Sequence, residues 1–130
     1  MAHESATFVL RHFQTLYAQG VVGNLADSQL LHQFVDGDGP SREDACAALV
    51  DRHGPMVLKI CRRMLPTLAD VEDVFQAVFL VLARKAGSLR EAETLKSWLH
   101  GVTVRTAQEA RRRASRQRSL EERATAARPL

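Results

Sequence analysis

Apolar residues in this chain recur at the spacing of a helix. Between Asp70 and Lys85 they fall at i, i+3, i+4, i+7 and i+11, at Val71, Val74, Phe75, Val78 and Leu82. This spacing places all five on one face of a helix with 3.6 residues per turn. No segment alternates apolar and polar residues for long enough to indicate a sheet. The sequence therefore predicts an all-α fold.

Capping residues and helix breakers set the expected bounds of the other helices. A short helix begins with Asp27 or Ser28 as its N-cap and ends in the breaker run DGDGPS at 36–41. The next helix is capped by Ser41. Gly54 and Pro55 interrupt its pattern, and Pro55 suits the first position of a continuing helix that ends at residue 65.

The helix at 70–85 is capped by Thr67 or Asp70 and is followed by a loop at 87–93. Thr94 or Ser97 opens the last and longest helix, which carries Leu95, Leu99 and Val102 inward with Trp98 beside them as a further core residue.

The chain divides into three parts. Residues 1–24 hold an amphipathic helix at 5–19 that we expect to pack on the main domain, residues 25–114 form that domain, and residues 115–130 are a basic linker or frayed helical tail. The expected architecture is a compact bundle of about four to five helices with an extra N-terminal helix.

The composition is that of a globular protein, with 45% apolar and 25% charged residues. The longest uninterrupted apolar run, at 77–83, is far shorter than the roughly 20 residues that cross a bilayer, and the N-terminus lacks the layout of a signal peptide. We therefore expect a cytoplasmic protein without membrane contact. Its two cysteines, Cys46 and Cys61, are then expected to be reduced core residues.

Positive charge is concentrated at the C-terminal end. Residues 101–130 hold 8 Lys+Arg and 3 Asp+Glu, whereas residues 1–100 hold 10 and 12. The C-terminal segment is the candidate for binding an anionic partner.

Four linked motifs carry a family resemblance. They are LLHQFVDGD at 30–38, ALVDRHGPMVLKICRRML at 48–65, DVEDVFQAVFLVLARKA at 70–86 and LKSWLHGVTVR at 95–105. Their order and spacing resemble region two of the extracytoplasmic-function (ECF) sigma factors. The variants RHGPMVL, FQAVFLVLARKA and SWLHGV are similar to those of planctomycete-type bacteria.

The resemblance implies a transcription initiation factor domain that binds core RNA polymerase and recognises and melts the minus-ten promoter element. In this family the helix that corresponds to 70–85 docks on the clamp helices of the largest polymerase subunit. An anti-sigma factor is an additional candidate partner. The residues that match the polymerase-binding pattern are Asp70, Glu72, Asp73 and Gln76, with Phe79 as a candidate apolar anchor.

The resemblance also implies contact with the non-template strand of promoter DNA. In the family, the loop at 87–93 and the start of the next helix capture an extruded base, for which the candidates are Ser88, Leu89, Arg90, Lys96 and His100. The charge pattern of the last helix independently predicts phosphate contacts, with candidates Arg105, Gln108, Arg112 and Arg113.

The chain departs from the family pattern in two respects. Many members place Asn near the position of Arg105, so their base preference does not transfer to this sequence. The family also carries a second, helix-turn-helix domain that reads the minus-thirty-five element, which this sequence does not include. We therefore interpret it as a shortened form with impaired promoter selection.

Other functional classes fit the sequence less well. It has no HExxH, glycine-rich phosphate loop or GxSxG, so we expect no enzyme activity and no cofactor. Cys46, His53 and Cys61 lack the paired spacing of a zinc site, and His53 with Asp51 is interpreted as an ordinary polar pair. Two alternatives remain: a helical regulatory fragment that binds polymerase or an anti-sigma protein without reading DNA, and a helix-turn-helix reader of duplex DNA.

Overall fold

The computed structural model describes residues 24–89 and 94–127, and this part of the chain contains four helices and no strand. The helices are α2 (Asp27–Asp36), α3 (Gly39–Met64), α4 (Leu68–Leu89) and α5 (Leu95–Ala127). The predicted all-α bundle is confirmed. The amphipathic helix expected at 5–19 lies outside the described residues.

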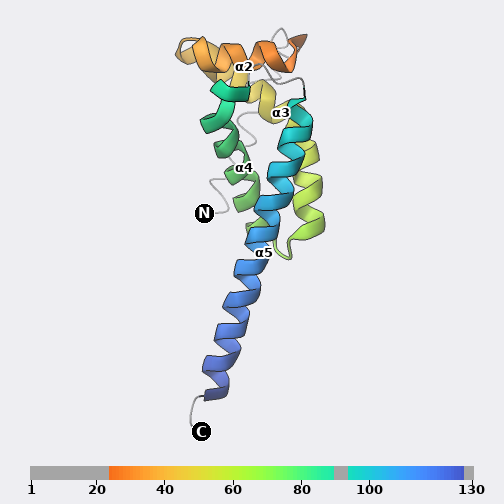
Figure 1. Ribbon diagram of the computed structural model, residues 1–130, viewed down its shortest axis with the longest axis vertical. Coiled ribbons are helices and arrows are strands. Elements are labelled where there is room, and N and C mark those ends of the chain that lie inside the picture. The colour runs from red at the N-terminus through yellow and green to blue at the C-terminus, as the bar shows by residue number, and fades with distance from the viewer. Residues whose placement is uncertain (1–23, 90–93, 128–130) are drawn as a thin grey trace.

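Three helices lie lengthwise beside one another and the fourth caps them (Figure 1). α5 packs on both α3 and α4, and α2 lies across one end of the bundle in contact with α3 and α4. Beyond the opposite end, α5 continues as a single projecting helix to Ala127, with every side chain from Ser115 onward exposed. Residues 115–127 are therefore helical and make no core.

The helix starts follow local capping, with two differences from the predicted caps. Asp38, and not Ser41, is the N-cap of α3, because its Oδ1 accepts a hydrogen bond of 3.0 Å from the Ser41 amide. The N-cap of α2 is Ala26, whose amide donates to the side chain of Gln29 at 2.8 Å. Thr67 caps α4 as predicted, since its Oγ1 accepts from the Asp70 amide at 3.1 Å.

α3 runs through Gly54 and Pro55 as one helix of 26 residues, so the interruption that the sequence predicted at these two residues is absent. α4 is longer than predicted, because it continues past Gly87 to Leu89. The reason is burial: Ala86 and Leu89 extend the apolar stripe of α4 by two further turns beyond Leu82, and all three are buried. Residues 87–89 are thus helix and not part of the expected loop.

The core is built from the predicted apolar faces. Val71, Val74, Phe75, Val78 and Leu82 of α4 are all buried, with exposed fractions of 4% or less. They meet Leu95, Leu99 and Val102 on α5, together with buried residues of α2 and α3. Burying one such side chain contributes about 1.5–3 kcal/mol. This core fixes the position of α5 between α3 and α4.

Both cysteines are free thiols that belong to this packing. Cys61 is fully buried and burial raises its pKa to about 11, while Cys46 is partly buried and burial raises its pKa as well. Both thiols stay protonated at neutral pH, which suits small core residues. Within the described residues, no helix combines the length and the apolar character that crossing a bilayer requires.

An ion-pair cluster joins α2 to α3, and it corrects the interpretation of His53. The partner of His53 is Asp27 and not Asp51: His53 Nε2 lies 3.0 Å from Asp27 Oδ1, and Arg52 Nη1 donates to the same oxygen at 2.8 Å. Partial burial acts to raise the pKa of Asp27, but hydrogen bonds and positive charge from His53 and Arg52 outweigh it and lower the pKa. Arg52 also donates to the Leu25 carbonyl. The cluster closes the end of the bundle that α2 covers.

Candidate functional site

The exposed face of α4 carries two polar side chains followed by an apolar one. Asp73, Gln76 and Leu80 lie at i, i+3 and i+7, which places them above one another on the side of the helix that points away from the core. All three are exposed, and Leu80 keeps 51% of its surface accessible. A carboxylate, an amide and a leucine on one ridge form a surface that suits a protein partner with a basic and an apolar patch.

The predicted apolar anchor, Phe79, occupies a different place. Its ring lies 4.9 Å from the ring of Phe75, centroid to centroid, and it packs against the core while remaining partly exposed. Leu80 is the large apolar side chain that α4 exposes most in its middle turns. Sequence reasoning missed Leu80, although its position between Val78 and Leu82, off the buried stripe, was a signal that could have identified it.

The other two predicted acids of α4 are less accessible. Asp70 is partly buried in the first turn, where it faces α5. Glu72 is also partly buried, and its Oε2 atom is inaccessible and has no hydrogen-bond partner among the described residues. The five predicted residues therefore do not share one face: Asp73 and Gln76 are exposed together, and the remaining three lie at the edges.

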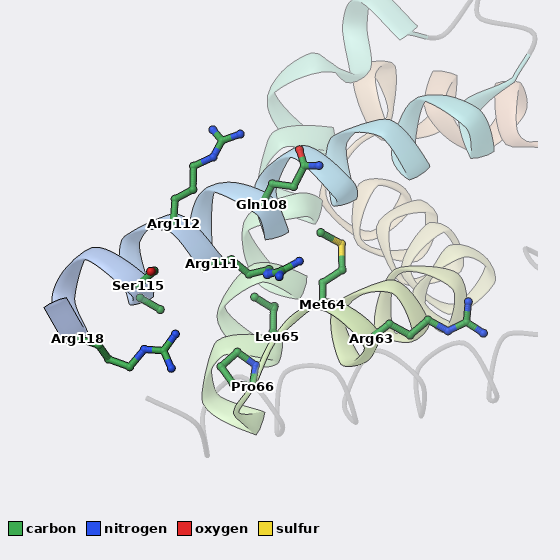
Figure 2. Close-up of a pocket in the computed structure, with 10 residues that line it drawn as sticks. Arg63, Met64, Leu65, Pro66, Gln108, Arg111, Arg112, Ser115 and Arg118 are labelled. Carbon is green, nitrogen blue, oxygen red and sulfur yellow. The ribbon is translucent and has the colours of Figure 1, made fainter.

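The basic residues of α5 border two grooves, one on each side of the helix. We call the first the cationic groove. It lies between α5 and the end of α3, has a volume of about 640 Å³ and contains four arginines (Figure 2). Its lining residues are Arg63, Met64, Leu65, Pro66, Gln108, Arg111, Arg112, Ala114, Ser115 and Arg118.

We call the second the mixed groove. It lies between α5 and the start of α4 and has a volume of about 690 Å³. It contains both acids and arginines, so the two predicted contact sets meet here. Its lining residues are Asp70, Asp73, Val74, Ala77, Arg105, Thr106, Glu109, Ala110, Arg113, Ala114 and Gln117.

Glu109 partly neutralises the basic run of α5. Its carboxylate oxygens lie 3.7 Å from Arg112, 3.5 Å from Arg113 and 3.6 Å from Arg116, counted to the nearest guanidinium nitrogen. All four side chains are substantially exposed, so each pair contributes little to stability. Arg111, by contrast, forms no ion pair with any described residue. The sequence contained a signal for two of these pairs that sequence reasoning missed, because Arg112 and Arg113 stand at i+3 and i+4 from Glu109 on one helix.

The candidates for base capture are only partly brought together. Lys96 and His100 are exposed one turn apart on the first two turns of α5, and Arg105 is exposed one turn further on. Ser88 is exposed at the end of α4, where its hydroxyl donates to the Lys85 carbonyl at 2.9 Å. Leu89 is buried in the core, which makes a direct contact with a base unfavourable.

Arg90 lies outside the described residues. Trp98 is partly buried and packs against the core, as the sequence predicted. The described part of the chain contains no cluster of three or more His, Cys, Asp or Glu side chains that could hold a metal ion.

The comparison with protein families decides which family this helical domain represents. The profile of the Sigma-70 region 2 family matches residues 49–117, which is more than half of the chain. The chain belongs to the Sigma-70 region 2 family. It is also similar to the ECF RNA polymerase sigma factor SigM of Mycobacterium tuberculosis (strain ATCC 25618 / H37Rv), at 33% identity over 89 residues. That alignment spans 68% of this chain but only 43% of the relative, and no solved structure matches the chain.

The Sigma-70 region 2 match includes the surfaces described above. It begins in the middle of α3, contains all of α4 and ends within α5 at residue 117. Both grooves fall inside it, apart from Arg118 of the cationic groove. The sigma-type resemblance carried by the four motifs is therefore confirmed at the level of the family and of similarity to an ECF sigma factor.

Proposed function

We propose that this domain is a transcription initiation factor domain that binds core RNA polymerase through α4 and recognises and melts the minus-ten promoter element through α5. Membership of the Sigma-70 region 2 family supports a role in polymerase binding and promoter recognition. The relative is named an ECF RNA polymerase sigma factor, which supports the ECF type for this chain as well. The planctomycete-type variant and an anti-sigma partner stay predictions.

The observation that carries the proposal is the division of α4 into two faces. One face is the buried stripe that holds the bundle together, and the other presents Asp73, Gln76 and Leu80 to solvent. These three side chains contribute little to the core and are exposed on one ridge, where a partner protein can contact them. The clamp helices of the largest polymerase subunit, which offer basic residues to the acids of this family, are the proposed partner.

DNA contact is assigned to the side of the bundle formed by α5. Lys96 and His100 lie one turn apart at the start of α5, whereas further along the helix Arg105 lines the mixed groove and Gln108 and Arg112 line the cationic groove. We propose that the first of these residues, with Ser88 and Arg90, face the extruded base of the non-template strand, and that the arginines bind backbone phosphates. A protein with these two partners acts in the cytoplasm.

A pull-down of bacterial core RNA polymerase tests the proposal. We expect wild-type protein to capture the enzyme, and the double substitution Asp73→Ala and Gln76→Ala to weaken capture about tenfold or more, because a charged contact at the centre of an interface is lost. Both residues are exposed, so helicity and thermal stability should not change. Glu43→Ala, which removes an exposed acid from α3, is the charge-matched control and should bind as the wild type does.

The result also separates the proposal from its alternatives. Native capture by the folded double variant would refute the assignment of Asp73 and Gln76. Absence of capture by well-folded wild-type protein would refute polymerase binding and favour a regulatory fragment that acts on another protein.

A further inference from the structure

Arginines from two different helices line the cationic groove. Arg63 stands in the last turn of α3, and Arg111, Arg112 and Arg118 come from α5. Figure 2 shows Arg111 extending from α5 toward Met64 and Leu65, with Arg63 on one side of the groove and Arg118 on the other. The folded chain thus brings Arg63 beside arginines of α5 that follow it by 48 or more positions in the sequence.

The groove contains no counter-charge of its own. None of the residues that line it is an acid, and among these arginines only Arg112 has an ion pair with a described residue, namely with Glu109 at 3.7 Å. Like charges that share a concave surface repel one another, and an anion bound between them removes this repulsion. The electrostatics therefore favour an anionic ligand.

Stabilisation of the end of α3 does not by itself account for this arrangement. Basic residues in the last turn of a helix interact favourably with its dipole, and Arg62 and Arg63 both stand in that turn. Only Arg63 lines the groove. The dipole therefore explains a basic pair at this position, but not why one member of the pair shares a concavity with Arg111.

The lining indicates which part of a nucleic acid would fit. Its floor is formed by Met64, Leu65 and Pro66, and none of the lining residues is aromatic, so bases have no stacking platform there. Arg111 and Arg118 are seven residues apart on one helix, a distance of roughly 10 Å along its axis. Since each strand of duplex DNA presents a phosphate about every 3.4 Å along its axis, such a pair spans several phosphates. The groove is open, basic and suited to a backbone.

We propose that the cationic groove binds the backbone phosphates of duplex DNA, and that Arg63 of α3 is a phosphate-binding residue together with Arg111 and Arg118. This inference rests on the proposed function in one respect, the assignment of DNA contact to α5. It adds to that function a second helix that contacts DNA, and a duplex segment in addition to the single strand at the extruded base.

The salt dependence of DNA binding tests the inference. Binding of the full chain to a fluorescent duplex of arbitrary sequence is measured by anisotropy over a series of NaCl concentrations. Each phosphate contact adds about 0.9 to the slope of log affinity against log salt on duplex DNA. We expect Arg63→Gln to make the slope shallower by about 0.9 and to weaken binding several-fold at about 50 mM salt. Arg111→Gln should act in the same way.

Arg62→Gln is the matched control. It removes the same charge from the adjacent exposed position of α3, but Arg62 does not line the groove. Its slope should equal that of the wild type. Equal slopes for Arg63→Gln and Arg62→Gln would overturn the inference, whether both are unchanged or both reduced, because only the overall charge would then matter. A reduction confined to single-stranded DNA of equal length would overturn the duplex assignment.

The polymerase pull-down keeps this test separate from the proposed function. Arg63→Gln should capture polymerase as the wild type does, because Arg63 belongs to α3 and the proposed polymerase contacts lie on α4. One outcome is that Arg63→Gln has a shallower salt slope of DNA binding but the wild type captures no polymerase. This outcome would support the phosphate site and refute polymerase binding. Polymerase capture by the wild type, together with an unchanged slope in Arg63→Gln, would support polymerase binding and refute the phosphate site.

Discussion

The cationic groove and the mixed groove flank the same helix and have similar volumes, about 640 and 690 Å³, but they differ in charge. Arg112 and Arg113 are neighbours in sequence, yet they line different grooves, because consecutive residues point about 100° apart around a helix. Arg112 lines the groove that includes the basic end of α3, whereas Arg113 lines the groove that includes the acidic start of α4. The chemistry of an arginine in this basic run thus depends on which helix lies opposite.

Because of this difference, the proposed polymerase and DNA contacts overlap in one groove but not in the other. The mixed groove brings Asp73, a proposed polymerase contact, beside Arg105 and Arg113, proposed DNA contacts. The cationic groove contains proposed DNA contacts and no proposed polymerase contact. We therefore expect changes in the cationic groove to act on DNA binding alone, and changes in the mixed groove to act on both partners.

The largest effect is expected from a core substitution that loosens α5 and so disrupts both grooves. Leu99 is fully buried on α5 and holds this helix against the bundle, so Leu99→Ala should lower the free energy of unfolding by about 3 kcal/mol through lost burial and the cavity left behind. Leu120→Ala is the matched control on the projecting part of α5, where 59% of the side chain is exposed. Its effect should be within about 0.5 kcal/mol.

Urea denaturation followed by circular dichroism measures both variants. Similar destabilisation by the two substitutions would contradict the conclusion that the projecting part of α5 makes no core.

An intermediate effect is expected at the residue that connects the two grooves. Glu109 lines the mixed groove and pairs with Arg112 of the cationic groove, so Glu109→Gln should release positive charge on both sides of α5. We expect duplex DNA affinity to rise about threefold at low salt, while stability changes by less than about 1 kcal/mol.

Glu122→Gln makes the same change of charge at an exposed site near the end of α5, outside both grooves. Fluorescence anisotropy should show a clearly smaller rise for this control. An equal rise in the two variants would mean that Glu109 acts only through net charge.

The smallest effect is expected far from both grooves, at the cluster that joins α2 to α3. The pKa of Asp27 is lowered in the folded state, so its ionised form contributes stability that is present above the unfolded pKa of about 3.9 and is lost as pH falls further. Asp27→Asn should therefore reduce Tm at pH 6 more than at pH 3. Because Asp27 is partly exposed, solvent screening limits the contribution to about 1 kcal/mol or less.

Thermal melts at the two pH values, with Asp51→Asn as the charge-matched control, measure this effect. A Tm difference between wild type and Asp27→Asn that does not shrink on acidification would contradict it. DNA binding of Asp27→Asn at neutral pH should equal that of the wild type. This result would confirm that the difference in charge between the grooves depends only on α5, α3 and α4.

The apolar periodicity of the chain was sufficient to predict the helices and most of the core. Val71, Val74, Phe75, Val78 and Leu82 are buried as predicted, because a 3.6-residue repeat leaves only one face that can meet the rest of the bundle. The four motifs were likewise sufficient to predict the family. Helix ends were less certain: α4 extends to Leu89 because burial of Leu89 outweighs the helix-breaking tendency of Gly87.

The partners of individual side chains were decided by the tertiary structure. His53 bonds to Asp27, which is 26 residues away, and not to its sequence neighbour Asp51. Arg63 joins the arginines of α5, and Glu109 links the two grooves. The sequence by itself determined which residues are helical, which face each helix buries and where charge accumulates, since these depend on local spacing. Only the packing of α5 between α3 and α4 decided which charges face one another, because such contacts depend on the positions of helices that are distant in sequence.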